Sequence, residues 1–172
     1  GDCNGAYFDG CETNTQTTAS HCGACNAACS VPNATPACTS GACAVGTCNP
    51  GYKNCNSQVT DGCEVNVLGS DLANCGACNA TCTVANGTPV CATGTCQVGS
   101  CSTDYRNCNN VASDGCEANI KTNANHCGAC GQACSFANAT GVCTNGGCGF
   151  TCLPGFQDLD GNSANGCEYG CT

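Results

Sequence analysis

The chain has 172 residues, and 26 of them are cysteine, well above the roughly 8–10% that marks a disulfide scaffold. Val, Ile, Leu and Phe are scarce, and Trp and Met are absent, which excludes a fold held together by an ordinary apolar core. The formal net charge is −9, with three Lys and Arg residues against 12 acidic ones, which argues against a nucleic-acid partner.

The cysteine content also indicates the compartment. Disulfides at this density persist only in an oxidising environment, and an even number of cysteines allows complete pairing within the chain. No apolar run approaches the roughly 18 residues of a membrane span, and no segment looks like a signal peptide. We therefore expect a mature secreted form, or a fragment of one, that is extracellular or at the cell surface and has no membrane span.

The chain repeats itself, and its period of about 52 residues is typical of tandem repeats. The string Asp-Gly-Cys-Glu occurs three times, Asn-Gly-Cys-Glu occurs once near the C-terminus, and the other cysteines keep the same phase. The repeats are at residues 1–54, 55–107 and 108–158, with an incomplete repeat at 159–172. The predicted fold class is small and disulfide-rich: tandem repeats with short β-hairpins and little helix.

Each repeat predicts the same local elements in the same order. At most one helical turn is expected at Cys-Gly-Ala-Cys. A hairpin is expected at residues 38–43, 91–96 and 143–148, where a glycine recurs at the place in which the turn needs a positive φ. Alternating residues at 64–68 and 117–120 predict a further short strand. The small core is expected to consist of cystines packed against Val31, Val84, Phe136, Tyr52, Tyr105 and Phe156.

The pattern changes after the third repeat, and the change suggests a pairing. Leu159 stands where the earlier repeats have Cys55 and Cys108, and an additional Cys171 follows Cys167 by four residues. The simplest interpretation is a short-range disulfide in each repeat, with Cys171 as the replacement partner of Cys167; the remaining pairings stay open. The predicted pairs are Cys3–Cys11, Cys55–Cys63, Cys108–Cys116 and Cys167–Cys171.

Several clusters could in principle hold a metal. Cys-x-x-Cys followed by a third cysteine could bind zinc or an iron–sulfur cluster, but eight cysteines per repeat exceed one four-ligand site, so we predict disulfides and no cofactor. The repeated acidic residues either hold calcium weakly or form turns in which Glu caps backbone amides, and we favour the turns. Residues 158–162 look calcium-like but lack the EF-hand register. The acidic candidates are Asp9, Glu12, Asp61, Glu64, Asp114 and Glu117.

No pattern in the chain predicts catalysis. His21 and His126 occupy equivalent positions, but the middle repeat has Asn74 there. Asn cannot replace a general base, whereas a turn or cap accepts either residue. Nucleophile, zinc-protease and phosphate-binding motifs are also absent from the sequence. We therefore expect that the protein is not an enzyme.

Four Asn-x-Thr sequons predict exposed loops. Three of them recur at one position of successive repeats. In a glycosylating host they would carry glycans and make the protein a glycoprotein, and otherwise they are only Asn turns. The candidate residues are Asn33, Asn79, Asn86 and Asn138.

The segments at residues 21–29, 74–82 and 126–134 read His/Asn-Cys-Gly-Ala-Cys-x-x-x-Cys. This pattern resembles the cysteine-rich repeats of plant stigma-specific-like proteins and of secreted tandem-repeat proteins of myxobacteria and their relatives. The resemblance covers about half of each repeat and lacks the plant family's adjacent Cys-Cys pair. It implies secretion and disulfides, and it transfers no catalytic residue.

Two classes of function fit these observations. The first is an extracellular, protease-resistant structural protein, a disulfide-stabilised subunit of a surface fibre, stalk or coat. Repeat arrays suit this function because each repeat contacts mainly its neighbours, and we expect the filament to form by head-to-tail self-association. The alternative is a secreted adhesion or carbohydrate- or protein-binding module. The near-identical, small and neutral loops favour the structural class.

Overall fold

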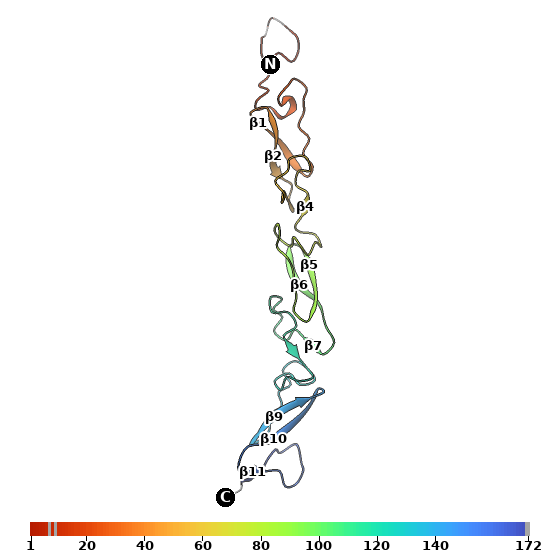
Figure 1. Cartoon of the computed structure of the whole chain (residues 1–172), viewed down its shortest axis with the longest axis vertical. Coiled ribbons are helices and arrows are strands. Elements are labelled where there is room, and N and C mark those ends of the chain that lie inside the picture. The colour runs from red at the N-terminus through yellow and green to blue at the C-terminus, as the bar shows by residue number, and fades with distance from the viewer. Residues whose placement is uncertain (7, 9, 171–172) are drawn as a thin grey trace. The chain divides into compact units, whose positions relative to one another are not determined.

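The computed structural model describes residues 1–6, 8 and 10–170. These residues form two-stranded antiparallel sheets joined by loops, with one short 3-10 helix, η1 (Ala19–His21). The predicted fold class, a cysteine-rich fold of repeated hairpins, is confirmed. The long hairpins pair β1 (Ala34–Thr39) with β2 (Ala42–Cys48), β5 (Gly87–Ala92) with β6 (Thr95–Cys101), and β9 (Ala139–Thr144) with β10 (Gly147–Cys152) (Figure 1). The short ones pair β3 (Tyr52–Lys53) with β4 (Val65–Asn66), β7 (Tyr105–Arg106) with β8 (Ala118–Asn119), and β11 (Phe156–Gln157) with β12 (Tyr169–Gly170).

The long hairpins form where the sequence predicts them, and their turns explain why. Each turn has two residues, and both have a positive φ, as at Asn145 (52°) and Gly146 (80°). This backbone matches the twist of the flanking strands, and glycine adopts it without steric cost. In the hairpin of β9 and β10 the two cysteines that flank the turn, Cys143 and Cys148, lie directly opposite each other. They face other segments, since each forms its disulfide elsewhere.

The core consists mainly of cystines, as expected, but only part of the predicted apolar set is buried. Val31 is buried, whereas Phe136 is half-buried and packs on Phe150 with ring centroids 4.9 Å apart. The sequence reasoning missed Val67 and Ile120, which are both buried. They directly follow the short strands β4 and β8. The other predicted core residues, Val84, Tyr52, Tyr105 and Phe156, are half-buried.

The compact units of the structure do not coincide with the sequence repeats. One unit contains residues 1–82 and 91–95, and the other contains residues 83–90 and 96–172. The division falls inside the repeat at 55–107. In the described part of the chain no helix is long and apolar enough to cross a membrane.

Candidate functional site: the joint between successive repeats

The disulfides follow one scheme, with three bonds inside each repeat and one to the next. Inside the repeats the bonds are Cys3–Cys25, Cys22–Cys38, Cys29–Cys43, Cys55–Cys78, Cys75–Cys91, Cys108–Cys130, Cys127–Cys143 and Cys134–Cys148. Cys82 and Cys96, the counterparts of Cys29 and Cys43, are disulfide-bonded as well. Between repeats the bonds are Cys48–Cys63, Cys101–Cys116 and Cys152–Cys167. These disulfides indicate an oxidising environment such as that of secreted proteins.

The short-range pairs predicted from the sequence are wrong. Cys3, Cys55 and Cys108 each bond to the second cysteine of a Cys-x-x-Cys, and Cys63, Cys116 and Cys167 bond to the preceding hairpin. Cys11 is free and exposed, and Cys171 lies outside the described residues. The physical reason is that a hydrogen bond, not a disulfide, closes the loop from residue 55 to residue 64: the Cys55 amide donates to the Glu64 carboxylate at 3.0 Å. Leu159 therefore leaves Cys167 with its usual kind of partner, Cys152.

The joint between repeats is a loop docked on a hairpin, and it is clearest at Cys116. The Cys116 amide donates to the Ala85 carbonyl at 2.9 Å, and Asn86 Nδ2 donates to the Cys116 carbonyl at 3.2 Å. Gly115 has φ +78°, and a Cβ there would lie 2.5 Å from the Ala85 oxygen, so only glycine permits the approach. With Cys101–Cys116 formed, the Cys116 side chain is 0% exposed.

Two further joints have the same construction. At the first, the Cys63 amide donates to the Pro32 carbonyl at 3.0 Å, and Asn33 Nδ2 donates to the Cys63 carbonyl at 3.1 Å. At the third, the Cys167 amide donates to the Ala137 carbonyl at 2.9 Å, and Asn138 Nδ2 donates to the Cys167 carbonyl at 2.9 Å. Cys63 and Cys167 are also 0% exposed. Two hydrogen bonds and one disulfide thus join segments that are distant in the sequence each time.

The acidic residues shape the docked loops, as the turn interpretation predicts. Glu64, Glu117 and Glu168 each accept a backbone amide nine residues earlier, at 3.0, 3.0 and 3.3 Å. In the first repeat Glu12 accepts the amides of Cys3 at 2.7 Å and Asn4 at 3.1 Å. Backbone hydrogen bonds lower the pKa of Glu12. The largest effect comes from the amide of Glu12 itself, and the next comes from the amide of Cys3. Asp9 lies outside the described residues.

Asp61 and Asp114 have a matching role in the loop. Each accepts a side-chain amide proton at 2.7 Å, from Asn56 and Asn109 respectively. In the last loop the two residue types are exchanged, and Asn165 Nδ2 donates to Asp160 at 3.1 Å. The exchange preserves the hydrogen bond, which shows that the pair is a structural clasp of the loop. The weak calcium prediction for Asp61, Glu64, Asp114 and Glu117 therefore has no support from their contacts.

A different acidic group does converge in the last loop. The carboxylates of Asp158, Asp160 and Glu168 lie within 4.8 Å of one another. The backbone amide of Asn162 and then the side chain of Asn165 lower the pKa of Asp160. All three carboxylates also accept hydrogen bonds that close the loop, so their proximity follows from the turn without any cation.

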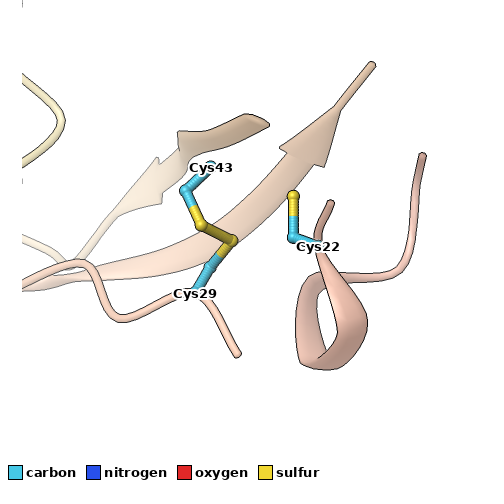
Figure 2. A group of neighbouring side chains, drawn as sticks. All are labelled: Cys22, Cys29 and Cys43. Atoms are coloured by element: carbon cyan, nitrogen blue, oxygen red, sulfur yellow. A yellow bond between two sulfur atoms is a disulfide. The ribbon is translucent and has the colours of Figure 1, made fainter. Parts of the chain in front are cut away.

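Sulfur atoms also gather at the Cys-x-x-Cys segments. The sulfurs of Cys22, Cys29 and Cys43 lie within 4.8 Å of one another, and so do those of their counterparts in the third repeat. Figure 2 shows the Cys29–Cys43 disulfide with the Cys22 sulfur beside it. Cys22 is bonded to Cys38, so none of the three sulfurs is a thiolate. Cysteine binds a metal as the thiolate, and these sulfurs instead form a compact group of cystines.

The equivalence of His21, Asn74 and His126 has a direct structural explanation. His21 Nδ1 accepts the amide of Asn26 at 2.9 Å, Asn74 Oδ1 accepts that of Asn79 at 2.8 Å, and His126 Nδ1 accepts that of Gly131 at 3.0 Å. Imidazole nitrogen and amide oxygen place an acceptor at the same point. The predicted turn or capping role is confirmed for all three.

The four sequons fall into two structural classes. Asn33, Asn86 and Asn138 donate their Nδ2 atoms, which would carry a glycan, to the docked loops. They are joint residues, and the joint explains why an asparagine recurs at this position of each repeat. Asn79 is exposed, and its positive φ of 58° places it in a turn of the Cys-x-x-Cys segment. It is the sequon asparagine whose side chain the joint does not use.

An open groove lies beside the first joint. Its volume is about 540 Å³, and its lining includes Pro50, Tyr52, Lys53 and Leu68. Tyr52 is half-buried and Leu68 is exposed. An aromatic ring beside an amine and an apolar side chain could contact a small ligand.

Comparisons with protein-family models, with curated proteins and with solved structures find no match to this chain. The resemblance to stigma-specific-like repeats stays a prediction from the cysteine spacing.

Proposed function

We propose that the protein is an extracellular structural repeat protein, a disulfide-stabilised subunit of a surface fibre, stalk or coat. The observation that carries the proposal is the joint, which occurs three times with the same contacts and covalently links each repeat to the hairpin before it. A joint of this kind serves continuity along the chain. A role other than catalysis is part of the same proposal.

The energetics of the joint suit a protein that must persist outside the cell. Cys101 and Cys116 are 15 residues apart, and a disulfide that closes a loop of this size contributes about 3 kcal/mol. Each joint also buries a cysteine completely and adds two hydrogen bonds. Many disulfide loops overlap, as in Cys48–Cys63 and Cys55–Cys78, so one proteolytic cut within such loops releases no fragment.

Electron microscopy of the oxidised chain over a range of concentrations tests the proposal. We expect fibres or ordered arrays that survive proteolysis and are lost when the disulfides are reduced. Monodisperse particles at every concentration and ionic condition would contradict a structural role.

The groove beside the first joint supports the alternative, a secreted adhesion or carbohydrate-binding module. Aromatic rings in open grooves can stack on sugars, and Tyr52 lines this one. A glycan array separates the two proposals. Binding that Tyr52→Ala abolishes would favour the adhesion module, and an array without signal would favour the structural role.

A further inference from the structure

The three joint asparagines have the same geometry but different successors in the chain. Asn33, Asn86 and Asn138 have φ of 51°, 51° and 50°, and each donates its Nδ2 to the carbonyl of a docked cysteine. Asn33 and Asn138 are followed by alanine, whereas Asn86 is followed by Gly87. The second joint, at Cys116, is therefore the one whose donor belongs to an Asn-Gly pair.

The packing of the second joint requires the glycine of this pair. A Cβ on Gly87 would lie 2.6 Å from the Ser100 oxygen and 3.0 Å from the Cys116 sulfur. Only a residue without a side chain permits so close an approach of the backbone. The other two joints accommodate Ala34 and Ala139 at the same position, where both are half-buried. The Asn-Gly pair is thus a consequence of how the second joint is built.

An Asn-Gly pair is chemically vulnerable. The backbone nitrogen of the second residue can attack Cγ of the asparagine side chain, which forms a five-membered succinimide ring and expels ammonia. A Cβ on the second residue obstructs this attack, and glycine has none. Asn86 is exposed, so the water that opens the ring reaches it. The reactive pair and the joint donor are the same residue.

We propose that Asn86 is a site of spontaneous deamidation, which loosens the second joint with time. The Gly87 nitrogen gives its proton to hydroxide and forms a bond to Cγ of Asn86. The bond from Cγ to Nδ2 breaks, and Nδ2 takes up a proton from water and leaves as ammonia. A second water then opens the ring and leaves aspartate or isoaspartate at position 86. In total one water is consumed and one ammonia is released, so the reaction needs no oxidant.

The joint itself controls the rate of this reaction. Asn86 Nδ2 donates to the Cys116 carbonyl at 3.2 Å, and this hydrogen bond must break before Nδ2 can leave. The reaction therefore proceeds from the open joint, and its rate follows the fraction of time that the joint is open. Opening of the joint is reversible, whereas loss of ammonia makes the change permanent.

Either product weakens the joint. A carboxylate only accepts hydrogen bonds, so the new side chain cannot donate to the carbonyl of Cys116, a residue that is 0% exposed. Isoaspartate also lengthens the backbone by one methylene group and displaces Ala85, whose carbonyl accepts the Cys116 amide. The Cys101–Cys116 disulfide still tethers the loop. If the protein has the structural function proposed above, its second joint loosens with age while the chain stays covalently continuous.

Incubation of the full oxidised chain in warm, mildly alkaline buffer tests the site. Samples are digested at acidic pH and mapped by mass spectrometry until one joint asparagine has converted, with an unincubated sample as the blank. We expect Asn86 to convert several-fold faster than Asn33 and Asn138. Conversion of Asn33 or Asn138 as fast as Asn86 would overturn the proposal.

A matched variant transfers the vulnerability to the first joint. Ala34→Gly creates an Asn-Gly pair at Asn33 and leaves the second joint unchanged, and peptide mapping of the disulfides checks that the variant has folded. Asn33 should then convert several-fold faster than in the wild-type chain, while Asn86 keeps its rate. An Asn33 whose rate does not change would contradict the role of the following glycine.

The control by the joint has its own test. Gly115→Ala removes the close approach that the second joint needs, so it should accelerate the conversion of Asn86 by about the same factor as it accelerates hydrogen exchange of the Cys116 amide. Asn33 in the same molecule should convert at its wild-type rate. Equal Asn86 rates in the wild-type chain and in Gly115→Ala would refute the control by the joint.

Asn86→Asp reproduces the product and tests its effect. The Cys116 amide of this variant should exchange about tenfold faster than in the wild-type chain, as expected for the loss of one hydrogen bond to a buried carbonyl. Partial reduction with a dithiol should also cleave Cys101–Cys116 sooner than in the wild-type chain, because the open joint exposes its sulfurs. Unchanged exchange and unchanged reduction would show that deamidation does not loosen the joint.

The two proposals fail separately. Ordered fibres from a chain in which Asn86 converts no faster than its counterparts would refute the deamidation site and leave the structural role standing. Rapid conversion of Asn86 in a chain that never assembles would refute the structural role and leave the site standing.

Discussion

Replacing the glycine of a joint by alanine should open that joint, and Gly10 offers a matched control. Gly115 and Gly10 have nearly the same backbone conformation, with φ of 78° and 77°, so alanine costs about 1–2 kcal/mol at either position. Only at Gly115 does the added methyl group meet backbone, 2.5 Å from the Ala85 oxygen. The two segments must move apart to relieve that contact, and this breaks the hydrogen bond from the Cys116 amide to the Ala85 carbonyl. The loss of this hydrogen bond adds about 1 kcal/mol to the cost of the substitution.

Amide hydrogen exchange at micromolar protein measures the difference, since each 1.4 kcal/mol changes an opening equilibrium about tenfold. In Gly115→Ala we expect the Cys116 amide to exchange about 100-fold faster, for a total of about 2–3 kcal/mol. In Gly10→Ala the Cys3 amide, which Glu12 accepts, should exchange about tenfold faster, from the backbone term alone. An unchanged Cys116 amide in Gly115→Ala, or equal effects of the two variants, would refute the joint as described.

Three further predictions concern single hydrogen bonds. His126→Ala removes the acceptor of the Gly131 amide and should destabilise that turn by about 1 kcal/mol, whereas His126→Asn should leave it intact; hydrogen exchange of Gly131 compares the two. The lowered pKa of Glu12 implies that the stabilisation from its hydrogen bond with the Cys3 amide is complete above the ordinary pKa of a glutamate and is lost as the pH falls through the lowered pKa. An NMR titration that follows the Cys3 amide should show this loss only at acidic pH, and a transition near neutrality would contradict it. In a glycosylating host, intact-mass measurement should find that Asn79→Gln removes all N-linked glycan, and glycan retained by that variant would show that the joint does not block the other sequons.

The sequence predicts the local structure well because local structure depends on residue type. The Gly of each long hairpin, such as Gly146, is recognisable because few residues adopt its conformation. The exchange of His126 for Asn74 identifies a capping acceptor, since both side chains place an acceptor at the same point. The role of Glu64 as a cap of backbone amides is predictable because a glutamate follows Gly-Cys in every copy of the motif. In each case the interacting groups are close together in the chain.

The pairing of cysteines could not be predicted in the same way. All cysteines share one period, so the sequence contains no signal that separates Cys55–Cys63 from Cys55–Cys78. Asn33 illustrates the same limit, because Asn-Ala-Thr reads as a sequon whether or not the asparagine side chain donates to a docked loop. Leu159 misled for the same reason, because its counterparts Cys55 and Cys108 are not the partners of Cys63 and Cys116.

By itself, the sequence determined that this protein is a chain of disulfide-rich repeats with hairpins at fixed places, since composition excludes an apolar core and turn residues fix local backbone. Only the tertiary structure decided how the repeats are joined. Cys116 meets Ala85 and Asn86, which lie far before it in the sequence, and only the folded backbone brings such segments together.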